Sequence, residues 1–216
     1  MKILVDLGEG FESEMLAFFA EFGVTPTNQQ VGSFGDAAMF SFGRDKIISS
    51  VHGGMVTTND ERLWKRMWSY KDHGKSYDAI YNREHPPGFR WLHESFGTNW
   101  RMTEMQAAIG RIQLTRMSDW TAKRQANGAQ LDKTARAFDC IRLVEVPDYS
   151  EHAEYKHYMF IKPEFLAEGW DRDRIVNTIV ERGVPCFQGS CSEVYLEKAF
   201  DNTPWRPETR LPNAVE

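Results

Sequence analysis

The sequence lacks the features that mark membrane, secreted and nucleic-acid-binding proteins. No uninterrupted apolar run approaches the ~18 residues that a bilayer span requires, and the run Ile3-Leu4-Val5 before Asp6 is too short for the apolar core of a signal peptide. Blocks of lysine and arginine are absent, and the net charge of −5 disfavours binding by neutralisation of phosphates. We therefore expect a soluble chain whose partners include neither a membrane nor a nucleic acid.

Cysteine is also scarce. The three cysteines, Cys140, Cys186 and Cys191, form no CxxC motif and are odd in number, so the sequence indicates neither a zinc site nor a complete set of disulfides. The histidines share no spacing that would place two metal ligands on one helical face. These absences favour a protein of the reducing cytoplasm without a metal site.

Apolar residues, in contrast, are plentiful enough for a large core: the 216 residues are 41% hydrophobic and 13% aromatic. Periodicity predicts strands over 3–5, 37–42 and 55–58, and helices over 13–22 and 60–74. Asn59 or Asp60 is suited to capping the second helix, and Gly74 is suited to ending it. Strands that alternate with helices in this way predict an α/β region.

The segment 75–100 is an aromatic-rich stretch with little periodicity, which predicts a long ordered excursion. Thr103 and Gln106 then form a capping box, and we expect the helix that it begins to continue to about residue 137. Its buried stripe is predicted from apolar spacing at Met105, Ala108, Ile109, Ile112 and Met117.

The last part of the chain reads as a smaller α+β region. Strands are predicted over 141–146 and 158–161, followed by a helix over 171–182 that Gly183 ends. We therefore expect two domains: residues 1–139, which include the long connecting helix, and residues 140–216.

Ser41 and Lys46 carry the strongest chemical signal, because a hydroxyl and an amine lie close together after an apolar strand. Lysine condenses with carbonyls and with pyridoxal phosphate, and a hydroxyl at a strand end suits a phosphate. Small residues would leave room for a flat ring beside the lysine: Ser49, Ser50, Gly53 and Gly54. The competing interpretations are a solvated surface lysine and an ordinary strand-end serine.

Several separated motifs resemble the DegT/DnrJ/EryC1/StrS family of pyridoxal-phosphate sugar aminotransferases. They are Gly-Ser-Phe-Gly-Asp at 32–36, Phe-Ser-Phe at 40–42, Asp-Lys at 45–46, Gly-Gly-Met-Val-Thr-Thr-Asn-Asp at 53–60, Asp-His-Gly-Lys-Ser at 72–76, the run from Phe96 to Leu114 and the run from Gly183 to Tyr195. The resemblance covers about residues 31–212 and is specific at several places.

The resemblance implies an aspartate-aminotransferase-like α/β fold in which residues 1–139 form part of the large cofactor-binding domain and residues 140–216 part of the small domain. It implies a homodimer whose active sites are built from both chains. Lys46 would form the Schiff base with pyridoxal phosphate and shuttle protons, and Ser41 would hold its phosphate. Asn99 would reach the phosphate of the partner subunit, with Arg101 beside it.

The implied activity is transfer of an amino group from an amino acid, with glutamate expected as the donor, to a nucleotide-linked keto-deoxy sugar. Such sugars enter polysaccharides, lipopolysaccharide and antibiotics. The sugar dehydratases of the same family are one alternative, but a histidine replaces their lysine, so Lys46 speaks against this branch.

The chain also departs from the family pattern. It has no room ahead of Lys46 for the usual phosphate turn and stacking aromatic, and it stops at residues 211–216, where the family continues. The strand 2–6 could replace the missing acidic strand, with Asp6 against the pyridinium nitrogen, although Glu9 then occupies a position where the family has glutamine. We therefore expect a chain truncated at both ends, and a non-catalytic remnant is a second alternative.

Overall fold

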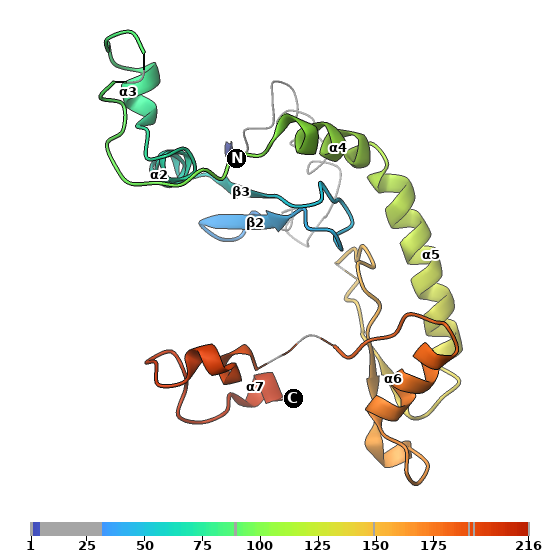
Figure 1. Ribbon diagram of the computed structural model, residues 1–216. Helices are drawn as coiled ribbons and strands as arrows, with labels where there is room; N and C mark the ends of the chain where they lie inside the picture. The colour runs from blue at the N-terminus through green and yellow to red at the C-terminus, as the bar shows by residue number, and fades with distance from the viewer. Residues whose placement is uncertain are drawn as a thin grey trace. The chain divides into compact units, whose positions relative to one another are not determined.

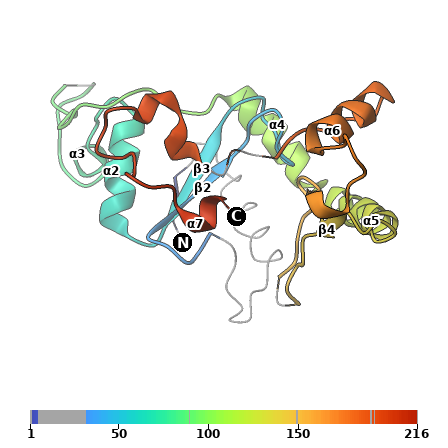
Figure 2. The ribbon, with the colours of Figure 1, turned by 90° about the horizontal axis from the view of Figure 1, so that it is seen from below.

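A computed structural model describes residues 2–4, 32–88, 90–148, 150–189, 191 and 193–215. The chain splits into two compact units (Figures 1 and 2): Met1–Lys133 together with Glu145–His157, and Thr134–Val144 together with Tyr158–Glu216. The helix predicted over 13–22 lies outside the described residues. Within them, no helix combines the length and the apolar character that a membrane crossing needs.

The first unit contains a small antiparallel sheet. Its strands are β1 (Lys2–Leu4), β2 (Ala37–Ser41) and β3 (Gly54–Thr58), in the spatial order β1-β3-β2. Ser41 at the end of β2 pairs with Gly54 at the start of β3, and Lys2 pairs with Thr58. The predicted strands are thus confirmed to within a residue or two at their ends, and β2 and β3 run side by side in Figure 2.

The core of this unit lies between the sheet, the loop after β2 and helix α4 (Glu104–Leu114). Its buried members are Phe42, Ile48, Met55, Ala107, Leu114 and Met117. The capping box is confirmed, because the Thr103 hydroxyl accepts from the Gln106 N–H and the Gln106 side chain returns a bond to the Thr103 backbone.

The predicted long helix is wrong, because the chain turns at Thr115 and Arg116 and a separate helix, α5 (Met117–Ala135), follows. The Thr115 hydroxyl donates to the carbonyl of Ile112 at 2.8 Å. The Arg116 N–H bonds to the carbonyl of Gln113, three residues back, instead of the usual four. A side chain that competes for a carbonyl and a tightened last turn are local causes of such breaks, which apolar periodicity does not reveal.

The predicted buried stripe is also wrong throughout α4, and of its members only Met117, which begins α5, is buried. Met105 is 75% exposed and Ile112 is 55% exposed, whereas Ala107, Gly110 and Leu114 are buried. Two faces of this helix are apolar, and the large side chains drew the prediction to the wrong one. The face with alanine and glycine is buried because small side chains allow a helix to lie close to its neighbour.

Helix α2 (Glu61–Lys71) begins and ends as predicted. The Asp60 carboxylate accepts from the N–H groups of Arg62 at 2.8 Å and Leu63 at 3.2 Å. Gly74 has a φ of +82° and donates its N–H to the carbonyl of Ser69 at 2.8 Å. This left-handed backbone and this hydrogen bond prevent the helix from continuing.

The excursion over 75–100 contains a short helix, α3 (Tyr77–Tyr81), that periodicity did not predict. The Ser76 hydroxyl caps it by accepting from the Ala79 N–H at 3.2 Å. Tyr77 packs edge-on against Trp64 of α2, with ring centroids 4.8 Å apart. A five-residue helix is too short to show a period, so the tertiary contact rather than the sequence pattern accounts for it.

The second unit has the predicted strand, strand, helix order. Strands β4 (Ile141–Leu143) and β5 (Met159–Ile161) pair in antiparallel register. Helix α6 (Arg172–Glu181) is capped by Asp171 and followed by Gly183 with a φ of +83°. The remaining elements are short: η1 (Pro163–Phe165), η2 (Val194–Leu196), η3 (Lys198–Phe200) and α7 (Pro212–Val215).

Candidate active site around Lys46

The loop 42–53 joins β2 to β3 and carries Lys46. Its base is closed by backbone bonds from the Phe42 N–H to the Gly53 carbonyl at 2.9 Å and from the Ser50 N–H to the Phe42 carbonyl at 3.1 Å. Ile48, 8% exposed, anchors the loop in the core. The loop is therefore a fixed part of the hairpin, and it presents Lys46 from a defined backbone.

Ser41 and Lys46 belong to one turn of this loop. The Gly43 N–H donates to the Ser41 hydroxyl at 3.3 Å, and the Gly43 carbonyl accepts from the Lys46 N–H at 3.0 Å. Ser41 is exposed, and the Lys46 side chain is 36% exposed. The Ser41 hydroxyl and the Lys46 backbone are thus held in the same turn, and both side chains reach solvent.

Two side chains contact the amine of Lys46: Asp45, to which the sequence analysis gave no separate role, and Tyr155, which it missed. The Lys46 Nζ donates to the Tyr155 hydroxyl at 3.1 Å and lies 3.8 Å from the Asp45 carboxylate. The Tyr155 hydroxyl in turn donates to Asp45 at 2.5 Å. This bond, more than the nearby positive charges of Lys46 and Lys156, lowers the pKa of Asp45.

The small residues near Lys46 serve the packing of the hairpin. Ser50 is 1% exposed and donates to the His52 carbonyl at 2.9 Å. A Cβ on Gly53 would lie 2.7 Å from Cε of Met102, and one on Gly54 would lie 2.8 Å from the Phe40 carbonyl oxygen. Protein atoms therefore occupy the Cβ directions of Gly53 and Gly54, although both glycines are exposed. That these residues leave room for a flat ring beside Lys46 stays a prediction.

Asn99 and Arg101 come together around Asp72. Asn99 pairs with Asp72 as an isolated backbone bridge, and its side-chain oxygen accepts from the Arg101 N–H at 3.4 Å. The Arg101 guanidinium forms an ion pair with Asp72, which Lys75 also approaches at 3.3 Å. Their contacts go to each other and to Asp72 rather than to Ser41 or Lys46. An anion bound by Arg101 would have to compete with Asp72.

Asp6, predicted to face the pyridinium nitrogen, lies outside the described residues. The donors that are described fit pyridoxal phosphate chemically: Lys46 supplies an accessible amine for its aldehyde, and Ser41 a hydroxyl for its phosphate. The Ser41 oxygen accepts from Gly43, so its own proton can be donated to a phosphate oxygen. Across the described ranges, no group of three or more histidine, cysteine, aspartate or glutamate side chains is placed to hold a metal ion.

Two relatives resemble the chain closely in sequence or structure. An aminotransferase from Psychrobacter cryohalolentis shares 56% sequence identity and a TM-score of 0.75, over 87% of this chain and 50% of that one. GDP-perosamine synthase from Caulobacter vibrioides is 39% identical over 103 residues, which are 48% of this chain and 25% of the relative.

A third neighbour shows the fold alone. It is the Escherichia coli GDP-4-keto-6-deoxy-D-mannose-3-dehydratase with bound hydrated PLP, at 21% identity and a TM-score of 0.63, over 76% of this chain and 43% of that one. The chain thus spans between a quarter and a half of the length of these relatives.

These neighbours confirm the predicted aspartate-aminotransferase-like fold, of which this chain is a part. A family model also matches residues 20–216. This match includes all the separated motifs from Gly32 to Tyr195 that predicted the family. The chain belongs to the DegT/DnrJ/EryC1/StrS aminotransferase family.

Proposed function

We propose that this chain provides the cofactor lysine of a pyridoxal-phosphate aminotransferase, which moves an amino group from an amino acid to a nucleotide-linked keto-deoxy sugar. Glutamate is the proposed donor, and the product is proposed to enter polysaccharide, lipopolysaccharide or antibiotic-sugar synthesis. The observation that carries the proposal is the single turn at the end of β2 that holds the Ser41 hydroxyl and the backbone of Lys46. The relatives named GDP-perosamine synthase and aminotransferase support it.

Each residue has a separate task in this proposal. Pyridoxal phosphate, when bound, supplies the electron sink that makes the α-proton of an amino acid acidic. Lys46 holds the cofactor through Nζ and, once released, takes and returns the proton as a general base and acid. Ser41 fixes the phosphate end with its hydroxyl. Because Ser41 and Lys46 share a turn, the two ends of the cofactor would be set by one piece of backbone.

Asn99, Arg101 and Asp6 have proposed tasks that depend on the assembled enzyme. In a cytoplasmic homodimer, Asn99 with Arg101 would reach the phosphate in the partner's active site, just ahead of helix α4, whose N-terminal amides favour anions. Asp6 would stabilise the protonated pyridine nitrogen through its negative charge.

Lys46 also discriminates between the branches of the family. A dehydratase would need a histidine at this position, whereas an aminotransferase needs a primary amine to carry both cofactor and proton. The alternative of a non-catalytic remnant predicts that the chain binds no cofactor, which makes it directly testable.

The test is the absorbance spectrum of the purified chain with pyridoxal phosphate. A new band is expected in the wild type and in Lys156→Ala, and not in Lys46→Ala. Lys156 is a matched control because its amine also lies beside Asp45, at 4.0 Å. Reduction with borohydride should leave the cofactor on the peptide that contains Lys46. A band that survives Lys46→Ala, or no band in the wild type, would contradict the proposal.

Transfer is tested separately, by adding glutamate to the cofactor-loaded chain. Conversion of the band together with release of 2-oxoglutarate is expected for a glutamate-dependent aminotransferase. If the loaded chain leaves glutamate unchanged, the cofactor assignment stands, but glutamate is not the amino donor.

A further inference from the structure

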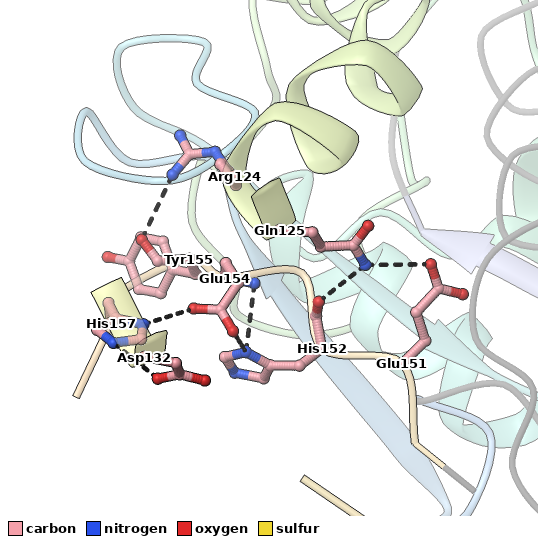
Figure 3. A network of polar contacts seen from close by, with 8 residues as sticks. All are labelled: Arg124, Gln125, Asp132, Glu151, His152, Glu154, Tyr155 and His157. Carbon is pink, nitrogen blue, oxygen red and sulfur yellow. Dashed lines mark hydrogen bonds and ion pairs between the residues drawn. The ribbon is translucent and has the colours of Figure 1, made fainter. Parts of the chain in front are cut away.

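The segment 151–157 is fastened to helix α5 within the first unit. Gln125 of α5 donates to the His152 carbonyl at 3.1 Å and to the Glu151 carboxylate at 3.3 Å. Arg124, the preceding residue of α5, donates to the carbonyl of Tyr155 at 3.5 Å. Figure 3 shows these bonds at Glu151 and His152, at the start of the segment, and at Tyr155 further along it.

Glu154 fastens the same segment a second time. Its carboxylate oxygens lie 3.1 Å from Nδ1 of His152 and 3.1 Å from Nδ1 of His157, whose Nε2 lies 3.3 Å from Asp132 of α5 (Figure 3). A Cβ on Gly128 of α5 would come within 2.9 Å of the Glu154 carboxyl carbon. Glycine at this place therefore lets the carboxylate lie directly against the helix. We call these contacts the clasp; its members are Arg124, Gln125, Asp132, Glu151, His152, Glu154 and His157.

Tyr155 stands in the middle of the clasp, with His152 and Glu154 before it and His157 after it. Its backbone carbonyl accepts from Arg124 of α5, and its side chain reaches the loop that carries Lys46. The hydroxyl accepts from the Lys46 amine and donates to the Asp45 carboxylate, so both of its hydrogen-bonding functions are used with a defined direction. The Lys46 amine also lies 4.8 Å from the centre of the tyrosine ring.

We propose that Tyr155, held by the clasp, is the positioning residue that orients the Lys46 amine toward its reaction partner; its role in catalysis rests on the function proposed above. A free lysine side chain samples many rotamers, and restricting them has an entropic cost. Because the clasp and Tyr155 restrict the side chain when the protein folds, this entropic cost does not fall on cofactor binding, and the amine is already oriented when a cofactor binds. Asp45 is 63% exposed, and exposed ion pairs contribute little to stability, so orientation explains this arrangement better than stabilisation does.

The first test uses no cofactor. Acetic anhydride acetylates amines, and mass spectrometry of the peptides gives the rate at each lysine. Tyr155→Phe keeps the ring and removes the hydroxyl. Lys46 should then react about fivefold faster, because its amine loses one hydrogen-bond acceptor. Lys71, a residue 9% exposed, should keep its rate, since its reaction reports opening of the whole fold.

Tyr81→Phe is the matched control, since Tyr81 is 63% exposed and contacts other rings through its own ring. It should leave the rate at Lys46 unchanged. An unchanged rate at Lys46 in Tyr155→Phe would overturn the positioning role. So would a parallel rise at Lys71, because that result would mean a loss of structure instead.

The second test adds pyridoxal phosphate and follows the rate of its attachment to Lys46 after borohydride quenching. Here attachment should be slower by about fivefold in Tyr155→Phe. The amine must attack the cofactor from one direction, and a loosened amine points in that direction less often. The opposite signs of the two tests distinguish orientation from exposure. If the wild-type chain takes up no cofactor at Lys46, the proposed function fails, while the labelling rates without cofactor still decide the positioning role.

Discussion

Substituting Gly74 by alanine should destabilise the first unit far more than the same change at Gly88. Both glycines have a positive φ, +82° and +92°, so alanine is strained at either position by roughly 1–2 kcal/mol. A Cβ on Gly74 would lie 1.8 Å from the Ser95 carbonyl oxygen, whereas nothing lies within 4 Å of one on Gly88. The difference between the two variants therefore isolates the contact with Ser95.

The magnitude follows from the bonds that this contact would break. The Gly74 carbonyl accepts from the N–H groups of Glu94 at 3.0 Å and Ser95 at 3.3 Å. The new Cβ and the Ser95 oxygen must separate by more than about 1 Å to reach ordinary contact, which disrupts both bonds at roughly 1 kcal/mol each. Gly74→Ala should thus cost roughly 3–4 kcal/mol, about 2 kcal/mol more than Gly88→Ala.

Urea unfolding, followed by tryptophan fluorescence, measures this difference. The slope with urea should stay constant between the variants, so that the midpoints report stability. Equal losses for the two variants would refute the reasoning, because the strain at φ would then be the whole effect and the contact with Ser95 would contribute nothing.

Two further predictions concern a cap and the clasp. Asp60→Ala should destabilise α2 by about 1 kcal/mol, measured by urea unfolding, while Asp60→Asn should retain most of the stability because asparagine also accepts the Arg62 and Leu63 N–H bonds; equal losses would mean that the cap is not used. Burial raises the pKa of Glu154, but hydrogen bonds from His152 and His157 outweigh it and hold that pKa below its ordinary 4.5. Glu154 therefore stabilises the fold fully above pH 4.5, and this contribution is lost as the pH falls through its lower folded pKa. The free energy of unfolding, measured by urea at a series of pH values, should fall less steeply with acid in Glu154→Gln than in the wild type. Identical pH dependences of the two proteins would contradict the prediction.

The elements that the sequence predicted well are those whose signals are local. Asp60 and Thr103 cap helices by bonds to residues two or three positions away, so the chain around them contains the whole interaction. The strands β2 and β3 are likewise apolar segments next to a glycine turn. For the same reason the turn that unites Ser41 and Lys46 could be anticipated: all of its bonds lie within a few residues.

The features that were missed depend on partners distant in the sequence. Which face of α4 is buried depends on what packs against Ala107 and Gly110, and a pattern of large apolar residues cannot report that. Tyr155 shows no motif that marks it, and its contact with Lys46 joins residues 109 positions apart. Such a contact is visible only once the chain is folded, because the intervening helices and loop set its geometry.

The separation between Lys46 and Tyr155 also orders events during synthesis. The hairpin of β2 and β3 closes over a loop of about a dozen residues, so it can form as soon as the chain has passed Thr58. Lys46 acquires its tyrosine only after the ribosome has added almost a hundred further residues, since Tyr155 and the clasp must first emerge. The reactive amine is therefore made early and receives its hydroxyl partner late, so a nascent chain carries it unheld while about a hundred further residues are added.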